Sequence, residues 1–264
     1  MDLGIRGRTA MVAAASKGLG KATARALLKE GVRVSISARS ADVLEATARE
    51  LLAETPGGEV IGVPTDVSKA ASIEAWFAET KKRFGGVDIL VTNTGGPPAA
   101  RFMDLTEAQW QEGIESTLMN VVRMSKLAAL DMKPRKWGRI LHITSFVAKQ
   151  PMDLLTVSST LRAGLSALTK TMSNQLAADN ILVNAVLPGH VMTDRQLHLN
   201  QIRAREEGIS VEAFVERATK AVPLGRHARP EEFGDVVAFL ASERASYITG
   251  ATLQVDGGVV QGTF

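Results

Sequence analysis

The chain has 264 residues, of which 45% are apolar and 22% are charged, which excludes the disordered and fibrous classes of protein. It contains no cysteine, which excludes disulfide scaffolds and cysteine nucleophiles and suits a reducing cytoplasm. The formal net charge is only +3 and no basic run interleaves with aromatic residues, so we expect no nucleic-acid partner.

From the first residues onward, the chain has neither the apolar core of a signal peptide nor a stretch of about 18 apolar residues. We therefore expect a cytoplasmic protein without a membrane partner. Short apolar runs rich in β-formers alternate with longer segments of helical period. The predicted strands cover Thr9–Ala14, Arg33–Ser37, Val60–Val63, Ile89–Thr92, Arg139–Thr144, Leu182–Leu187 and Thr252–Val255. Their continuous apolar character is typical of strands that are buried on both faces.

The alternation of strands and helices predicts the fold class. Repeated β-α-β units with right-handed crossovers give one α/β domain over residues 1–264, a Rossmann-like doubly wound parallel sheet of about seven strands flanked by helices. Ser40 is expected to open one helix, Thr106 and Gln109 form a capping box, and Pro230 occupies a first helical turn.

The charged segment 190–222 is predicted to form a helical lid over the substrate, or a helix pair that only completes the fold. Its apolar positions recur at helical spacing, as expected of an amphipathic cover: Leu197, Ile202, Ile209, Val211, Phe214 and Val215.

The first strand runs into the glycine-rich sequence AAASKGLG, residues 13–20, and then into a helix expected to begin around Lys21. Such a turn lets backbone amides approach a pyrophosphate at a helix N-terminus, although glycine turns close many other βα units. Arg39 lies 19 residues past Gly20, where arginine accommodates a 2′-phosphate, and Lys17 adds a second positive charge. The pair indicates NADP rather than NAD, unless both are solvated surface residues.

Over essentially its whole length the sequence resembles the short-chain dehydrogenase/reductase family, in particular its 3-oxoacyl-ACP-reductase-like members. The matching motifs are, in chain order, residues 13–20 with Ala13 and Ala14 in place of the usual Thr and first Gly, Asp66-Val67, Thr92-Asn93-Thr94-Gly95, Asn184–Gly189 with Thr193, Pro223–Arg226, Pro230–Glu232, Tyr247–Gly250 and Val255–Gly258. The resemblance implies NADP, with NADPH preferred over NADH. The implied cofactor-binding residues are Ser16, Lys17, Gly18, Leu19, Gly20, Arg39, Asp66, Val67, Asn93, Gly95, Arg162, Pro188, Gly189, Val191 and Thr193.

The family's reaction uses a serine, a Tyr-x-x-x-Lys pair and an upstream asparagine. Ser145 matches the serine, whereas Ser158 and Arg162 stand at the tyrosine and lysine positions. Thr117 stands at the asparagine position, and Asn120 follows three residues later. The resemblance therefore implies an atypical active site.

These replacements matter because a ketone oxygen that gains negative charge must be protonated. A serine hydroxyl such as that of Ser158 is a far weaker acid than a phenol, and Arg162 does not release its proton in proteins. The only tyrosine, Tyr247, belongs to a motif near the far end of the chain. We expect cofactor binding and oxyanion stabilisation to persist without the usual proton donor.

Three hypotheses follow. In the first, an NADP-dependent oxidoreductase transfers hydride to or from a carbonyl of a 3-oxoacyl or other apolar ketone, with His190 as the relocated acid. The alternative interpretation is that His190 is an exposed loop residue with no role in the reaction. Of the other histidines, His142 is expected to be packed in a strand, and His198 and His227 are expected at the surface.

In the second hypothesis, hydride reduces an activated C=C bond, and Ser145, Ser158 and Arg162 bind the enolate oxygen while water protonates carbon. Relatives that reduce dienoyl-CoA also have serine at the tyrosine position, but they use another, upstream tyrosine that this chain lacks. In the third, the protein binds NADP(H) without turnover, as a sensor or assembly partner.

The expected partner is a small apolar molecule, indicated by apolar residues near the site: Phe146, Met152, Leu154, Leu155, Val191 and Met192. The resemblance implies a homotetramer, formed in part through the tail Leu253–Thr263. No cluster of ligating residues at metal spacing occurs, so we predict no metal site.

Overall fold

Seven strands form one sheet in the computed structural model, which describes residues 2–263. They are β1 (Thr9–Val12), β2 (Arg33–Ala38), β3 (Val60–Pro64), β4 (Ile89–Thr92), β5 (Gly138–Ile143), β6 (Ile181–Pro188) and β7 (Thr252–Val255). Every residue of β1, β4, β5 and β6 is buried, whereas the edge strands β3 and β7 are partly exposed. The predicted burial on both faces is therefore confirmed for these four strands and is wrong for β3 and β7, because an edge strand has a neighbour on one side only.

All strand pairs are parallel, in the order β3-β2-β1-β4-β5-β6-β7. The α-helices are α1 (Gly18–Lys29), α2 (Ala41–Glu54), α3 (Ala70–Phe84), α4 (Glu107–Gly113), α5 (Asn120–Met132), α6 (Thr156–Leu176), α7 (Asp194–Glu206), α8 (Val211–Lys220) and α9 (Pro230–Leu240). Shorter helical segments are η1 (Phe102–Asp104), the π-helix η2 (Ile114–Met119), η3 (Lys133–Arg135), η4 (Phe146–Ala148), η5 (Ala177–Asp179) and η6 (Glu243–Ala245). This confirms the predicted doubly wound α/β fold.

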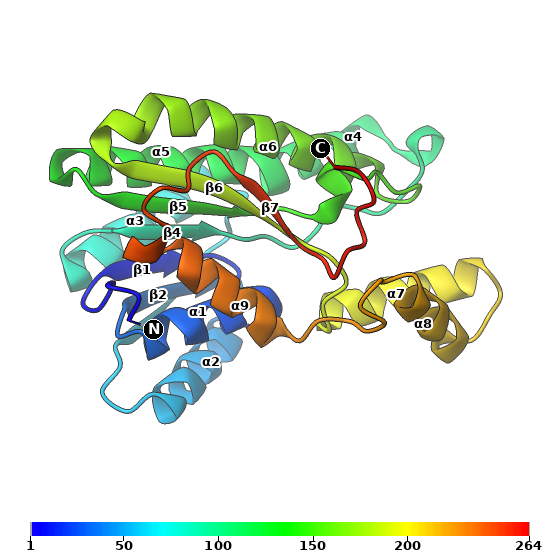
Figure 1. Ribbon diagram of the computed structural model, residues 1–264, viewed down its shortest axis with the longest axis horizontal. Coiled ribbons are helices and arrows are strands. Elements are labelled where there is room, and N and C mark those ends of the chain that lie inside the picture. The colour runs from blue at the N-terminus through cyan, green and yellow to red at the C-terminus, as the bar shows by residue number, and fades with distance from the viewer. Residues whose placement is uncertain (1, 264) are drawn as a thin grey trace.

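Two helical layers cover the sheet (Figure 1). Helices α1, α2 and α9 lie on one face, where Leu27, Leu44 and Phe233 belong to one core cluster. Helices α3, α5 and α6 lie on the other face, where Trp76 and Met124 belong to a second core cluster. Helices α7 and α8 project beyond the carboxyl ends of the strands. None of the helices between residues 2 and 263 combines the length and apolar character needed to cross a membrane.

The local helix-start predictions hold. Ser40 precedes α2, Pro230 is the first residue of α9, and Thr106 with Gln109 forms both bonds of a capping box. The predicted last residue of β1 and the predicted first residue of α1 were wrong. Strand β1 ends at Val12 rather than Ala14, and α1 begins at Gly18 rather than near Lys21, because the glycine turn already winds into the first helical turn.

The lid segment is helical, but the expected apolar inner face of α7 is wrong. Leu197 is 44% exposed, whereas Asn200 is fully buried. The predicted apolar inner face is found on α8, where Phe214 is buried. Helix α7 thus turns polar side chains toward the protein.

Candidate active site

The site is a crevice at the carboxyl end of the sheet, between β1 and β4. The chain leaves β1 toward β2 on one side and continues from β4 toward β5 on the other, and open α/β sheets bind ligands at such a reversal. Asn93, directly after β4, donates from Nδ2 to the Ala14 carbonyl oxygen at 3.3 Å. This bond holds the glycine turn against the β4 loop.

The N-terminus of α1 is shaped for a phosphate. Gly18 has φ +56°, and a Cβ on Gly20 would lie 2.5 Å from the Ala14 carbonyl oxygen, so a side chain would force the turn apart. No side chain caps this end of α1 and its first turn carries no acidic residue. The first-turn amides are therefore free to bind an anion, which fits the diphosphate of a dinucleotide.

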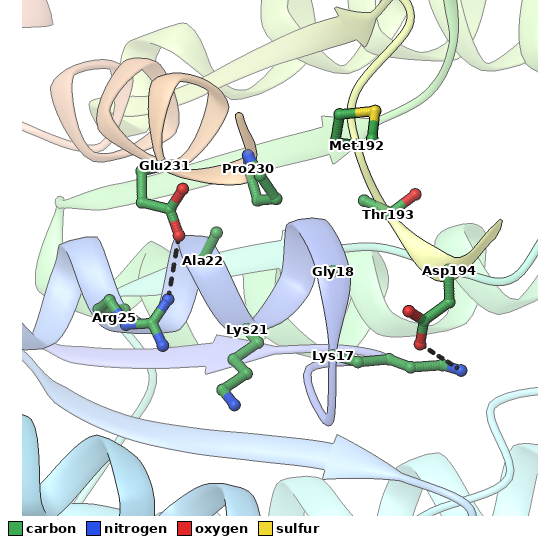
Figure 2. Close-up of a pocket in the computed structure, with 10 residues that line it drawn as sticks. All are labelled: Lys17, Gly18, Lys21, Ala22, Arg25, Met192, Thr193, Asp194, Pro230 and Glu231. Carbon is green, nitrogen blue, oxygen red and sulfur yellow. Dashed lines mark hydrogen bonds and ion pairs between the residues drawn. The ribbon is translucent and has the colours of Figure 1, made fainter. Parts of the chain in front are cut away.

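A cavity of about 200 Å³ lies beside this turn, between α1, the start of α9 and the segment before α7 (Figure 2). Lys17 forms an ion pair of 3.0 Å with Asp194, and a Cβ on Gly18 would lie 3.4 Å from the Thr193 methyl carbon. Thr193 itself caps α7, accepting from the Gln196 amide at 3.2 Å. The phosphate turn and the first turn of α7 thus lie side by side.

The other sequence-predicted cofactor residues lie around the same edge. Arg39 follows β2, is exposed and makes no ion pair within residues 2–263, while Asp66 follows β3. Bonds from the Ser68 hydroxyl and amide lower the pKa of Asp66, so it stays a carboxylate. The Ser16 carbonyl oxygen accepts a hydrogen bond from the Thr47 hydroxyl. Leu19 packs against one core cluster and Val67 packs against the other. A Cβ built on Gly95 would meet no atom within 4 Å.

The loop after β6 forms the opposite wall. Pro188 ends β6, Val191 bridges to Ala228, and a Cβ on Gly189 would lie 2.6 Å from Asp256 Cα. These contacts fix the loop between the tail of the chain and α7.

Ser158 and Arg162 lie together on α6, one helical turn apart. Arg162 Nε donates to Ser158 Oγ at 3.1 Å, and its Nη1 donates to the Thr144 carbonyl oxygen at 2.7 Å. Ser145, the next residue, begins the turn after β5 and accepts from the Val147 amide at 3.3 Å. The structure therefore brings three of the four predicted catalytic residues, all but His190, to the carboxyl end of β5.

The guanidinium of Arg162 is a buried charge, with only 7% of the residue exposed. Burial lowers its pKa to about 10, helped by the like charge of Arg195, so it stays protonated at neutral pH. Because Ser158 accepts the Nε proton, its own hydroxyl proton is free to donate. This pair can hydrogen-bond a developing oxyanion, but it does not supply a proton.

Thr117 and Asn120 both lie beneath this site. Thr117 is buried in the π-helix η2, with its hydroxyl unpartnered within residues 2–263. Asn120 is fully buried and bonds the Ser116 carbonyl oxygen in its own helix at 2.7 Å. Its amide is therefore occupied inside the helix.

His190 lies in the loop after β6, in ring contact with two neighbours. Its ring centroid lies 5.4 Å from that of Phe146 and 5.5 Å from that of His227. Burial lowers its pKa, and the charges of His227 and Arg203 lower it further. Its Nδ1 is enclosed and has no hydrogen-bond partner among the described residues. The Nδ1 atom of this half-buried imidazole is thus without a partner among residues 2–263, and the ring lies beside Phe146, the residue that follows Ser145.

The other histidines divide differently from the prediction. His142 is packed as expected, with its ring nitrogens against Ser125 at 3.0 Å and Thr169 at 2.8 Å, and His198 is exposed. The surface prediction for His227 was wrong: it is 9% exposed, because it lies between His190 and the Met192 sulfur.

Sequence reasoning missed Arg195, Arg203 and Asn200 of α7, which turn toward the site. Arg195 Nη2 lies 3.5 Å from the Pro97 carbonyl oxygen, and Arg203 Nη2 lies 3.7 Å from the Met152 sulfur. The available signal was their spacing over two helical turns, which places them on adjoining strips of one side of the helix. Among residues 2–263, no group of three or more His, Asp or Glu is placed to hold a metal.

The fold and this crevice define a Rossmann-type oxidoreductase of the short-chain dehydrogenase/reductase class. A family model described as enoyl-(acyl carrier protein) reductase matches residues 13–260, and the chain belongs to this family. It is 33% identical to the 3-oxoacyl-(acyl-carrier-protein) reductase of Aquifex aeolicus over 259 residues, covering 98% of this chain and 100% of that one. It is 34% identical to the enzyme of the same description from Synechocystis over 255 residues, 96% and 97% of the two chains.

Among solved structures, the L-sorbose reductase of Gluconobacter frateurii in complex with NADPH and L-sorbose superposes with a TM-score of 0.94. It is 32% identical, over 99% of this chain and 100% of that chain. The prediction of NADP(H) as the cofactor is confirmed at the level of the family and its solved structures.

Proposed function

We propose that the protein is an NADPH-dependent oxidoreductase that transfers hydride to or from a carbonyl, with a proton donor other than tyrosine. The observation that carries the proposal is the Arg162–Ser158 contact of 3.1 Å, anchored on the Thr144 carbonyl oxygen beside Ser145. It presents a hydroxyl and a guanidinium where a carbonyl oxygen would gain charge. The reductases of A. aeolicus and Synechocystis and the L-sorbose reductase act, by their names, on carbonyl substrates.

The cofactor supplies the hydride when it is bound. We assign its phosphates to Lys17 and the first-turn amides of α1, and a 2′-phosphate to the unpaired Arg39. Asp66 binds the adenine end, and Asn93 and Arg162 bind the nicotinamide end. The remaining predicted residues shape the crevice through their backbone.

His190 is our candidate for the proton donor. Its pKa is lowered by burial, so the protonated ring is scarce at neutral pH and more abundant in mild acid. A reduction that depends on His190 must therefore slow as the pH rises through this lowered pKa.

A second candidate reaction is the reduction of an activated C=C bond. The description of the matching family as an enoyl reductase favours it, as does the serine at position 158. Hydride would add to carbon, Ser158 and Arg162 would bind the enolate oxygen, and water would protonate the other carbon. This route needs no acidic side chain.

The test is NADPH consumption with ketones, 3-oxoacyl thioesters and enoyl thioesters. We expect Ser158→Ala to lower kcat/KM by about 10²-fold through loss of an oxyanion donor, whereas Ser159→Ala, a matched change of its neighbour on α6, leaves it within a few-fold. Loss of ketone reduction in His190→Phe supports the relocated acid. Tight NADPH binding without consumption of any of the three classes contradicts the proposal and favours a binding module.

The remaining partner predictions concern the whole assembly. We retain the homotetramer, the lid role of residues 190–222 and the cytoplasmic location as proposals. The apolar cluster of Phe146, Val147 and Leu155, with Met152 packed against it, supports an apolar portion of the substrate.

A further inference from the structure

Three arginines converge on the site, and none of them has an acidic partner. Arg162, Arg195 and Arg203, here called the arginine cluster, form no ion pair within residues 2–263. The other guanidinium in this region, Arg101, is paired with Asp153 at 3.1 Å. Arg162 is buried and Arg203 is half-buried, and a guanidinium that is buried without a counter-charge costs free energy, so an anion would stabilise this cluster.

The neighbouring carboxylates are engaged elsewhere. Asp194 pairs with Lys17 at 3.0 Å, Glu207 pairs with Arg217, and Asp256 accepts from the amides of its own turn. Burial lowers the pKa of Arg203, and the charges of Glu206 and Glu207 oppose this, but neither carboxylate forms an ion pair with it among residues 2–263. The protein therefore compensates Arg203 only in part, and no carboxylate of the described residues pairs with Arg162 or Arg195.

The geometry opens the cluster toward the crevice. Arg162 uses Nε and Nη1 for protein bonds, and its Nη2 has no partner among residues 2–263. Arg195, although exposed, extends across the loop after β4, where a Cβ on Gly96 would come within 2.4 Å of its Nη2. Arg203 reaches the Met152 sulfur, on the loop that carries the apolar cluster.

The buried face of α7 gives a second, independent observation. Asn200 is fully buried, yet its Nδ2 donor has no partner among residues 2–263, while its Oδ1 accepts from Gln196 at 2.8 Å. The Nδ1 of His190 is likewise enclosed and unpartnered within those residues. Most other unpartnered buried groups of the described chain are hydroxyls elsewhere in the fold, whereas these two are nitrogens on the α7 side of the site, and a polar ligand there would satisfy them.

We propose that the substrate carries a carboxylate, bound by the guanidinium groups of Arg195 and Arg203. The inference rests on the proposed oxidoreductase function, because it names the substrate class of the same site. The reacting carbonyl lies toward Ser158 and Arg162, and the carboxylate lies toward α7. An oxo acid with an apolar carbon chain then satisfies both the arginine cluster and the apolar cluster.

A phosphate of the cofactor is the other possible source of the anion. The two sources are separated by measuring binding of NADPH alone and then binding of acids to the protein saturated with NADP+. The probes are oxo acids of four to six carbons, with the oxo group at position 2, 3 or 4, each compared with its uncharged amide. Binding rather than turnover is measured, so failure of the proposed function does not hide the result.

We expect at least one acid to bind ten-fold or more tightly than its amide. Arg195→Gln and Arg203→Gln should abolish this preference, Arg203→Lys should retain part of it, and NADPH affinity should stay within about three-fold. Arg205→Gln is the matched control, because Arg205 is an exposed residue of the same helix. Thermal melts confirm that each variant is folded.

Two results would overturn the inference: acids that bind no better than their amides throughout the series, or variants that lose NADPH affinity as much as acid affinity. The second result would assign the arginines to the cofactor phosphates. A preference for acids without NADPH consumption would support the inference and contradict the oxidoreductase.

Discussion

Ala14 is held in a conformation that favours glycine. Its φ is +48°, in the left-handed region, at the position where the family motif has its first glycine. This conformation costs an L-residue about 1–2 kcal/mol. Glycine avoids the steric cost, but it loses more conformational entropy on folding, so the net gain from glycine is smaller. The turn between β1 and α1 is therefore strained by the alanine at this position.

We expect Ala14→Gly to raise the free energy of unfolding by up to about 1 kcal/mol. Ala13→Gly is the control, because Ala13 is fully buried and has no positive φ, so it should lose stability instead. Urea denaturation of both variants measures the difference. Equal destabilisation by the two changes would show that the strain at Ala14 is negligible.

His142 makes stability depend on pH. Burial lowers its pKa from 6.5 to about 4, so the unfolded chain binds a proton in the window between these values and the folded protein does not. Its contribution is complete above pH 6.5 and is lost as the pH falls toward 4. Between pH 7 and pH 5 this single group should remove about 2 kcal/mol of stability.

The measurement is the free energy of unfolding against pH for the natural protein and for His142→Gln. We expect a shallower slope in the variant, whatever its absolute stability. His198→Gln changes an exposed histidine and should keep the original slope. Identical slopes in all three proteins would mean that the pKa of His142 is the same in the folded and unfolded chains, which contradicts the prediction.

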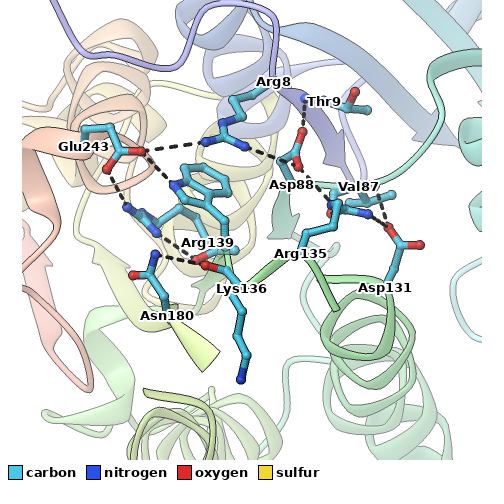
Figure 3. A network of polar contacts seen from close by, with 12 residues as sticks. Arg8, Thr9, Val87, Asp88, Asp131, Arg135, Lys136, Arg139, Asn180 and Glu243 are labelled. Atoms are coloured by element: carbon cyan, nitrogen blue, oxygen red, sulfur yellow. Dashed lines mark hydrogen bonds and ion pairs between the residues drawn. The ribbon is translucent and has the colours of Figure 1, made fainter. Parts of the chain in front are cut away.

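At the scale of elements, a polar network fastens the amino end of β5 to η6 (Figure 3). Arg139 is 1% exposed and lies 4.3 Å from the Trp137 ring centroid, and its Nη2 lies 3.3 Å from Glu243 Oε2. Trp137 Nε1 donates to Glu243 Oε1 at 2.7 Å, and Arg8 covers the ring at 3.8 Å from its centroid. One carboxylate thus compensates two guanidiniums and an indole donor.

Removing that carboxylate should destabilise the protein. Glu243→Gln leaves Arg139 buried without a counter-charge, and we expect a loss of about 1–3 kcal/mol, below the cost for a fully buried pair because Glu243 is 44% exposed. The control is Glu45→Gln. Glu45 pairs with Arg49, and both side chains are 69% exposed, so we expect the free energy of unfolding to change by at most about 0.5 kcal/mol. Thermal melts of both variants measure the two losses of stability. A loss no greater than that of the control would make the network a surface feature.

Elements defined by neighbouring residues could be predicted from the sequence, and those defined by distant contacts could not. The Thr106–Gln109 capping box joins residues three apart, and β4 follows its apolar run Ile89–Thr92 without change. The orientation of α7 depends on which surface it meets. Periodicity could not show that Asn200 turns inward and Leu197 outward.

The same distinction applies to the site. The order of the motifs along the chain located the glycine turn, which follows a strand, and Ser158 and Arg162, which lie on a helix that covers the sheet. It missed Arg203 and placed His227 at the surface, because both reach the site from segments far away in the sequence. Each motif that was recognised is thus local in sequence, whereas Arg203 and His227 are brought to the site by tertiary packing.

On the scale of the whole molecule, α7 and α8 are less firmly packed than the sheet. Only Asn200 and Ala204 of α7 and Phe214 of α8 are buried, whereas β5 and β6 are buried throughout. Segments with few buried apolar side chains open at low free-energy cost. The helix pair projects from the body of the protein, beyond the carboxyl ends of the strands (Figure 1).

We expect amide hydrogens of 194–206 and 211–220 to exchange faster than those of β5 and β6, and to slow when NADPH binds. The reason is the position of Thr193, which caps α7 and lies against Gly18 in the glycine turn, so that a ligand at α1 should immobilise the start of α7. Hydrogen-exchange mass spectrometry measures both effects, with residues 124–132 of α5 as an internal control because they pack on the face of the sheet opposite α1. Exchange of α7 that is unchanged by NADPH while α1 becomes protected would show that the two helices move independently, and would contradict this coupling.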